Sequence, residues 1–139
     1  PEIADFIQFL SKALNARVHG PISQEQLAFE YSTIDVFLLT YMADLKESDR
    51  SNSHKILEYL STGKVIVSSK LEHYIEHADL LSMATTDDDS DLPEIFGRVV
   101  YRLAELNDSV KQRLRKCLAL DNTYTSHLNR IGQLVAASQ

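Results

Sequence analysis

The chain holds a single cysteine, Cys117, so no disulfide can form within its 139 residues. A lone thiol in a helical pattern indicates a buried or half-buried side chain and a reducing cytoplasm as the compartment. No apolar run approaches the length of a membrane span, and the N-terminus lacks a basic segment followed by an apolar one. The chain begins at Pro1 without methionine, and we expect a segment of a longer protein.

A basic stripe and the common catalytic motifs are absent as well. The net charge of -6, with acids dispersed outside residues 87–91, argues against nucleic acid as a partner. No G-x-G-x-x-G, P-loop, G-x-S-x-G or zinc-type cysteine pattern occurs, which disfavours dinucleotide oxidoreductases, P-loop phosphotransfer and serine hydrolysis. His73 and His77 could face one metal, but no third ligand follows at a suitable spacing, so we expect no metal site. The acidic run 87–91 is interpreted as a surface turn.

Apolar residues make up 44% of the chain, enough for the core of one domain over residues 1–139. Their spacing predicts an α/β protein with a parallel sheet, because strands and helices alternate. The predicted strands are 16–19, 35–41, 65–69 and 80–84. The predicted helices are 3–14, one capped by Ser23 and Gln26, one following Ser53, one with Pro93 in its first turn, and two in a helical tail over 107–139. Residues 35–41 are apolar on both faces, which is typical of a central strand.

Residues 50–69 carry the strongest local signal. A capping-rich lead-in is followed by an amphipathic helix, a glycine at 63 and a β-branched run. One helix face is apolar and holds Ile56, Leu57 and Leu60; the opposite face holds Ser51, His54, Lys55 and Glu58. Free N–H groups and Lys55 suit an anion, and Glu58 suits sugar hydroxyls, so this face could bind a phosphorylated ligand. The alternative is a solvated outer face behind a helix cap.

The loop before this helix is a second candidate feature. It runs from Met42 to Ser51 and is longer than a typical connection between a strand and a helix. It carries five charged residues, Asp44, Lys46, Glu47, Asp49 and Arg50. Ligands bind at the carboxyl ends of the strands in an open α/β sheet, so this loop is predicted to belong to an active site.

Four blocks of the sequence resemble the C-terminal Rossmann-like domain of GT-B glycosyltransferases, in particular glycosyltransferase family 4 (glycosyl transferases group 1). The specific block is the third, Ser53-His54-Lys55-Ile56-Leu57-Glu58-Tyr59-Leu60-Ser61-Thr62-Gly63-Lys64-Val65-Ile66-Val67. The others are 18–22 with 26–27, then 35–40, and finally 121–124 with Leu128, Arg130 and Ile131. The resemblance spans nearly the whole chain and implies a partial Rossmann-like domain.

The resemblance also implies roles for individual residues. Glu58 matches the second glutamate of the family's E-x7-E element, which binds ribose hydroxyls. Arg50 stands where the first glutamate is expected, and Asp49 or Glu47 could substitute for it. The nucleotide-sugar-binding residues implied are two groups: Gly20, Pro21 and Ile22 at a turn that meets the base, and Thr40, Ser53, His54, Lys55 and Glu58, of which 53–55 face the diphosphate.

The implied function is a retaining, metal-independent glycosyltransferase that needs no cofactor and transfers a sugar from a nucleotide-diphosphate donor to a glycan or lipid-linked acceptor. The family's acceptor-binding domain and two earlier strands, with their arginine and lysine, are not in this chain. We therefore expect half a donor site, peripheral membrane association of the full-length enzyme, and a sheet edge covered, for instance, by a second copy. One rival is a non-catalytic nucleotide-binding or interaction module, favoured by Arg50. A receiver-like domain would need an aspartate at the end of strand 35–41, which has none.

Overall fold

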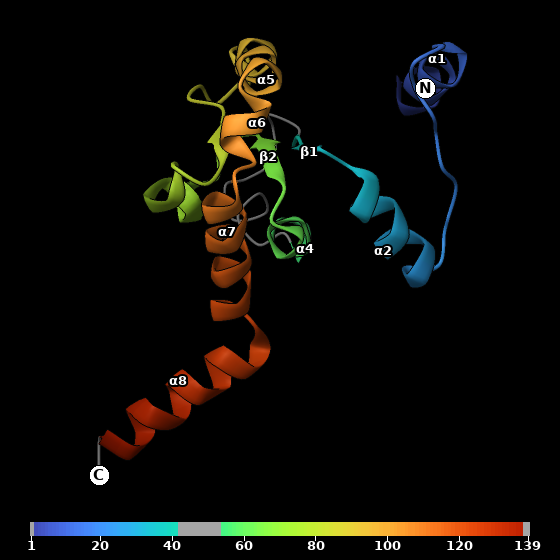
Figure 1. Cartoon of the computed structure of the whole chain (residues 1–139). Helices are drawn as coiled ribbons and strands as arrows, with labels where there is room; N and C mark the ends of the chain where they lie inside the picture. The colour runs from blue at the N-terminus through green and yellow to red at the C-terminus, as the bar shows by residue number, and fades with distance from the viewer. Residues whose placement is uncertain (1, 42–53, 138–139) are drawn as a thin grey trace. The chain divides into compact units, whose positions relative to one another are not determined.

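The computed structural model describes residues 2–41 and 54–137, which group into two compact units (Figure 1). The first comprises residues up to Ser32 and the second begins at Thr33. The prediction of one domain over 1–139 stays a prediction. No helix in the described ranges is long and apolar enough to cross a membrane.

The first unit holds α1 (Glu2–Lys12) and most of α2 (Gln24–Thr33). The predicted cap of α2 is confirmed, because the Gln26 backbone N–H donates to Ser23 Oγ at 3.2 Å. The predicted strand at 16–19 is wrong: its backbone is irregular and its residues are exposed. An extended segment gains little without a neighbouring strand to satisfy its backbone groups, and these residues pair with none.

The second unit contains a parallel sheet in the order β1-β2-β3, which confirms the predicted α/β class (Figure 1). Its strands are β1 (Val36–Leu39), β2 (Val65–Ser68) and β3 (Ser82–Met83). The prediction that the first of them is central is wrong, because β1 lies at an edge and Leu38 is 53% exposed. β2 is the central strand, and all four of its residues are buried.

Helices cover both faces of this sheet. On one face, Val65 and Val67 of β2 share a core with Ile95 and Val99 of α5 (Leu92–Tyr101). Neighbouring strand residues point to opposite faces, so Phe37 and its register partner Ile66 face the other side. There the Tyr59 ring of α4 (His54–Thr62) stacks on Phe37, with ring centroids 4.2 Å apart.

The predicted helical tail is confirmed as α7 (Ser109–Asp121) and α8 (Tyr124–Ala137), preceded by the short α6 (Leu103–Leu106). A 3-10 helix, η1 (Glu72–His77), joins β2 to β3. Asp108 caps α7, because its carboxylate accepts from the backbone N–H groups of Val110 and Lys111. The prediction that Cys117 is buried or half-buried is wrong, because its side chain is exposed on this helix.

Two polar residues attach the tail to the sheet. Asn107 accepts from the Val65 backbone N–H at 3.0 Å and donates to the Asp35 carbonyl at 3.1 Å, so it joins the amino ends of β1 and β2. Arg115 of α7 is 1% exposed. Its guanidinium donates to three backbone carbonyls, those of Leu80 at 2.8 Å, Gly63 at 3.0 Å and Leu106 at 2.8 Å.

Candidate functional site

The direction of α4 relative to the sheet determines which end a ligand could approach. α4 ends at Thr62, just before β2 begins at Val65, so its C-terminus lies at the amino ends of the parallel strands. Its N-terminus therefore lies at their carboxyl ends, as predicted for the helix after Ser53. This is the edge of an open α/β sheet at which ligands bind.

A groove of about 820 Å³ runs between α4 and the corner that joins α7 to α8. Eleven residues line it: His54, Leu57, Glu58, Ser61, Lys116, Ala119, Leu120, Asn122, Thr123, Tyr124 and His127. The rings of His54 and Tyr124 are 6.4 Å apart at the start of α4. Just beyond the C-terminal end of α4, Gly63 lies against Gln112 of α7. α4 and α7 are therefore antiparallel neighbours, and the groove follows their seam.

His54 and Glu58, two of the residues assigned to the nucleotide sugar, line this groove one helical turn apart. Lys55 is not among the lining residues, but its Nζ lies 2.7 Å from Glu58 Oε2. The two side chains are 48% and 42% exposed, so solvent screens the pair and it adds little stability. The consequence of the pair is electrostatic, because the Lys55 ammonium group balances the charge of the Glu58 carboxylate.

The remaining predicted residues are distributed as follows. Thr40 directly follows β1 and is exposed at the carboxyl end of the sheet. Gly20, Pro21 and Ile22 form an irregular bend in the first unit, whereas the groove belongs to the second. Ser53 and the charged loop residues Asp44, Lys46, Glu47, Asp49 and Arg50 lie outside the described residues.

A polar cluster at the carboxyl ends of β1 and β2 was not predicted. Ser69 Oγ accepts from the Tyr41 backbone N–H at 2.9 Å and donates to the Asp89 carboxylate. Asp89 adopts a left-handed backbone conformation, with φ of 58°. Three buried atoms, Tyr41 Oη, Ser68 Oγ and Asp89 Oδ1, have no hydrogen-bond partner within the described chain. No local sequence pattern predicts this cluster, because Ser69 and Asp89 are 20 residues apart in the chain.

The acidic run 87–91 is a surface turn, as predicted, and some of its carboxylates also make hydrogen bonds that hold the turn. Asp91 accepts hydrogen bonds from the Thr85 backbone N–H at 2.9 Å and the Thr85 hydroxyl at 2.6 Å, which hold its pKa at about 2. His73 and His77 lie on η1. Over the residues that the structure describes, no group of three or more histidine, cysteine, aspartate or glutamate side chains could hold a metal ion.

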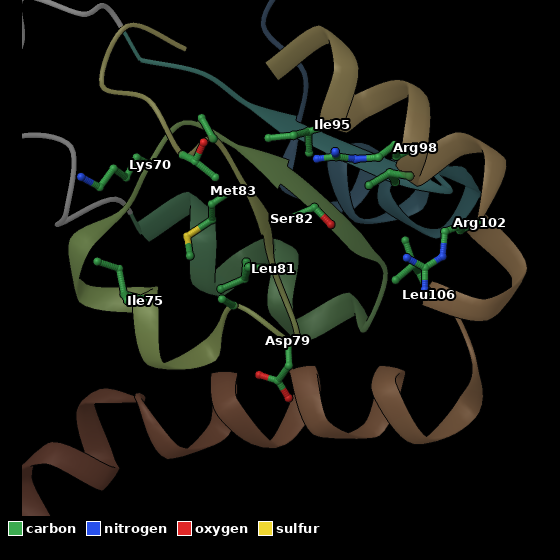
Figure 2. A pocket seen from close by; sticks show the side chains of 14 residues that line it. Lys70, Ile75, Asp79, Leu81, Ser82, Met83, Ile95, Arg98, Arg102 and Leu106 are labelled. Atoms are coloured by element: carbon green, nitrogen blue, oxygen red, sulfur yellow. The ribbon is translucent and has the colours of Figure 1, made fainter. Parts of the chain in front are cut away.

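A second cavity of about 520 Å³ lies beside β3, between η1 and α5 (Figure 2). Its lining includes Lys70, Arg98 and Arg102, and each of these cations already has an acidic partner. Arg98 Nη1 is 3.0 Å from Glu94, and Arg102 Nη2 is 2.6 Å from Glu105. None of the predicted site residues lines this cavity, so the groove along α4 is the better candidate.

Searches against protein-family models, curated proteins and solved structures find no match to this chain.

Proposed function

We propose that this chain is the donor-binding part of a retaining, metal-independent glycosyltransferase that uses a nucleotide-diphosphate sugar. The observation that carries the proposal is that His54 and Glu58 line one groove on a helix whose N-terminus lies at the carboxyl ends of a parallel sheet. In this assignment Glu58 accepts ribose hydroxyls, and His54 with Lys55 contacts the diphosphate. The acceptor is a glycan or a lipid-linked acceptor, bound by another part of the enzyme.

The chemistry would be electrostatic. When the bond from sugar to phosphate breaks, negative charge grows on the departing nucleoside diphosphate. The backbone N–H groups at the start of α4 and the Lys55 ammonium group are donors oriented before the reaction begins, so they stabilise that charge with little reorganisation.

The proposal predicts different effects for two substitutions. Glu58→Gln keeps the shape of the side chain but removes its charge, and should lower the affinity for both nucleoside and nucleoside diphosphate about tenfold, or ~1.4 kcal/mol. Lys55→Ala should weaken the binding of the nucleoside diphosphate much more than the binding of the nucleoside. Calorimetric titration with uridine, guanosine and adenosine and their diphosphates measures both effects.

Glu94→Gln is the matched control. Glu94 pairs with Arg98 at 3.0 Å on α5, outside the groove, so its substitution removes a similar exposed ion pair without touching the assigned site. If Glu58→Gln binds nucleosides as tightly as the wild type does, this face of α4 is a solvated surface and the assignment is wrong.

A non-catalytic nucleotide-binding module is the second candidate, because Arg50 replaces the first glutamate that the resemblance implies. The two candidates predict the same binding but different turnover. Release of nucleoside diphosphate from a nucleotide sugar by a longer protein that includes this chain would support the enzyme, and binding without release would support the module.

A further inference from the structure

We propose that His127 of α8, together with Tyr124, forms the second wall of the diphosphate site and clamps the ligand against His54. This inference rests on the proposed function, since it assigns the partner of the diphosphate in the same groove. The resemblance assigns the diphosphate to residues 53–55 at the start of α4, and only the fold brings α8 beside that helix.

Three ring side chains gather at the end of the groove where α4 begins. The centroids of the His54 and Tyr124 rings are 6.4 Å apart and the ring planes are inclined at 40°, so the two rings are not stacked on each other. His127 follows Tyr124 by three residues on α8, so the two project from the same helix face. All three line the groove.

Hydrogen bonds hold this corner in place. The Thr123 hydroxyl accepts from the Ser126 backbone N–H at 3.2 Å and caps the start of α8. Ser126 Oγ donates to the Leu120 carbonyl at 2.8 Å, and Arg130 Nη2 donates to the Asp121 carbonyl at 2.7 Å. These bonds join the first turns of α8 to the last turn of α7, so His127 is positioned by the backbone of both helices.

The groove carries several side chains that can donate hydrogen bonds. The imidazoles of His54 and His127 and the phenol of Tyr124 can donate. The Lys116 side chain reaches toward Gly63, so its cation belongs to the other end of the groove. Glu58 is the one acid among the lining residues, and its charge is balanced by Lys55 at 2.7 Å. Several convergent donors suit a ligand with many anionic oxygens, which is the chemistry of a diphosphate.

The spacing of His54 and Glu58 along α4 suits a nucleoside diphosphate. Glu58 lies one turn, about 5.4 Å, from His54 on the same helix face. A ribose at Glu58 and a diphosphate at the end that holds His54 and His127 would match this spacing, because imidazole donors for phosphate oxygens are available at that end. Leu57, Ala119 and Leu120 are the apolar residues of the lining.

NMR of the imidazole C2–H groups tests the clamp in the intact chain, with sodium pyrophosphate as the first probe and uridine diphosphate as the second. The resonances of His54 and His127 should shift together with one dissociation constant, and those of His73 and His77 on η1 should stay in place. His127→Gln should lower the affinity for pyrophosphate about three- to tenfold, and Tyr124→Phe should lower that affinity less. His73→Gln is the matched control and should bind as the wild type does.

The outcomes separate the clamp from the proposed function. If pyrophosphate moves His54 but not His127, or if His127→Gln binds it like the control, the clamp is wrong and the donor site on α4 remains. If neither pyrophosphate nor uridine diphosphate moves any imidazole while uridine binds through Glu58, the clamp is again wrong. If no nucleoside and no diphosphate binds, both proposals are wrong.

Discussion

Arg115 is a charged residue that acts as part of the core. Its guanidinium is 1% exposed and donates to carbonyls that belong to three separate segments, those at Gly63, Leu80 and Leu106. Burial lowers the pKa of this side chain, and the nearby Asp108 and Asp79 carboxylates oppose that change. The charge is kept, because arginine does not deprotonate in proteins, and the three carbonyls depend on it.

Arg115→Met should therefore destabilise the chain by about 3–5 kcal/mol, since it fills the space but leaves three buried carbonyls without a donor. Urea denaturation followed by circular dichroism measures the change. Arg113→Met on the exposed side of the same helix is the control and should change stability by less than about 0.5 kcal/mol. Equal effects of the two substitutions would contradict the structural role of Arg115.

The lowered pKa of Asp91 predicts that the stability of the chain depends on pH in the acid range. Hydrogen bonds from the side chain and backbone of Thr85, and a further bond from Thr86, lower its pKa from 3.8 to about 2. A folded pKa below the unfolded value favours the ionised, folded form. Its contribution to stability is thus complete above pH 3.8 and is lost as the pH falls toward 2.

Asp91→Asn should remove this part of the acid destabilisation, so its stability should fall less between those pH values than that of the wild type. Thermal melts from pH 5 downward measure the difference, with Asp121→Asn, at an exposed position outside the turn, as the control. Parallel stability curves for Asp91→Asn and the wild type would rule out the assigned hydrogen bonds.

At the scale of elements, the seam between α4 and α7 depends on Gly63. Its φ is +79°, and a Cβ there would lie 2.8 Å from the Gln112 carbonyl oxygen. The glycine ends α4, and its lack of a side chain lets α7 approach closely enough for Arg115 to reach the Gly63 carbonyl.

Gly63→Ala should destabilise the chain by at least ~1–2 kcal/mol from backbone strain alone, and by more because the methyl group would separate α4 from α7. Gly97→Ala is the matched control: Gly97 lies within α5, and a Cβ there meets nothing within 4 Å. The control should be neutral or stabilising by up to about 1 kcal/mol, as expected in a helix. Differential scanning calorimetry compares the two, and an unchanged melting temperature for Gly63→Ala would contradict the close contact.

At the scale of the whole molecule, the chain has more apolar helix surface than its described core covers. α8 exposes four apolar side chains at helical spacing, namely Leu128, Ile131, Leu134 and Val135, each more than half exposed. β1 also lies at a sheet edge. Both features agree with the proposal that this chain supplies only part of an enzyme, because the resemblance assigns strands and the acceptor-binding domain to other segments.

The purified chain should therefore show no transferase activity with any nucleotide sugar, although it should bind nucleoside diphosphates. Incubation with radiolabelled sugar donors, followed by chromatography of the released sugar, measures this. Glu58→Ala is the reference, and turnover above that reference would overturn the prediction of an incomplete active site.

Local patterns in the sequence were sufficient to predict those helices and strands that depend mainly on residues close to them in the chain. The β-branched run at 65–68, the glycine after α4 and Pro93 at the start of α5 each act within one or two turns of chain, and all three predictions are confirmed. The parallel pairing of β1 with β2 followed as well, because the helix between them allows little else.

Only the tertiary structure decided which groups meet across the chain. Residues 16–19 have the composition of a strand but no strand to pair with, and β1 is apolar on both faces yet lies at an edge. Arg115 donates a hydrogen bond to the Gly63 carbonyl, 52 residues away in the chain, and Ser69 donates one to Asp89, 20 residues away. Such partners are set by how helices and strands pack, and packing depends on the summed burial of many side chains rather than on the order of a few. The same reason places His127 beside the helix that carries His54 and Glu58.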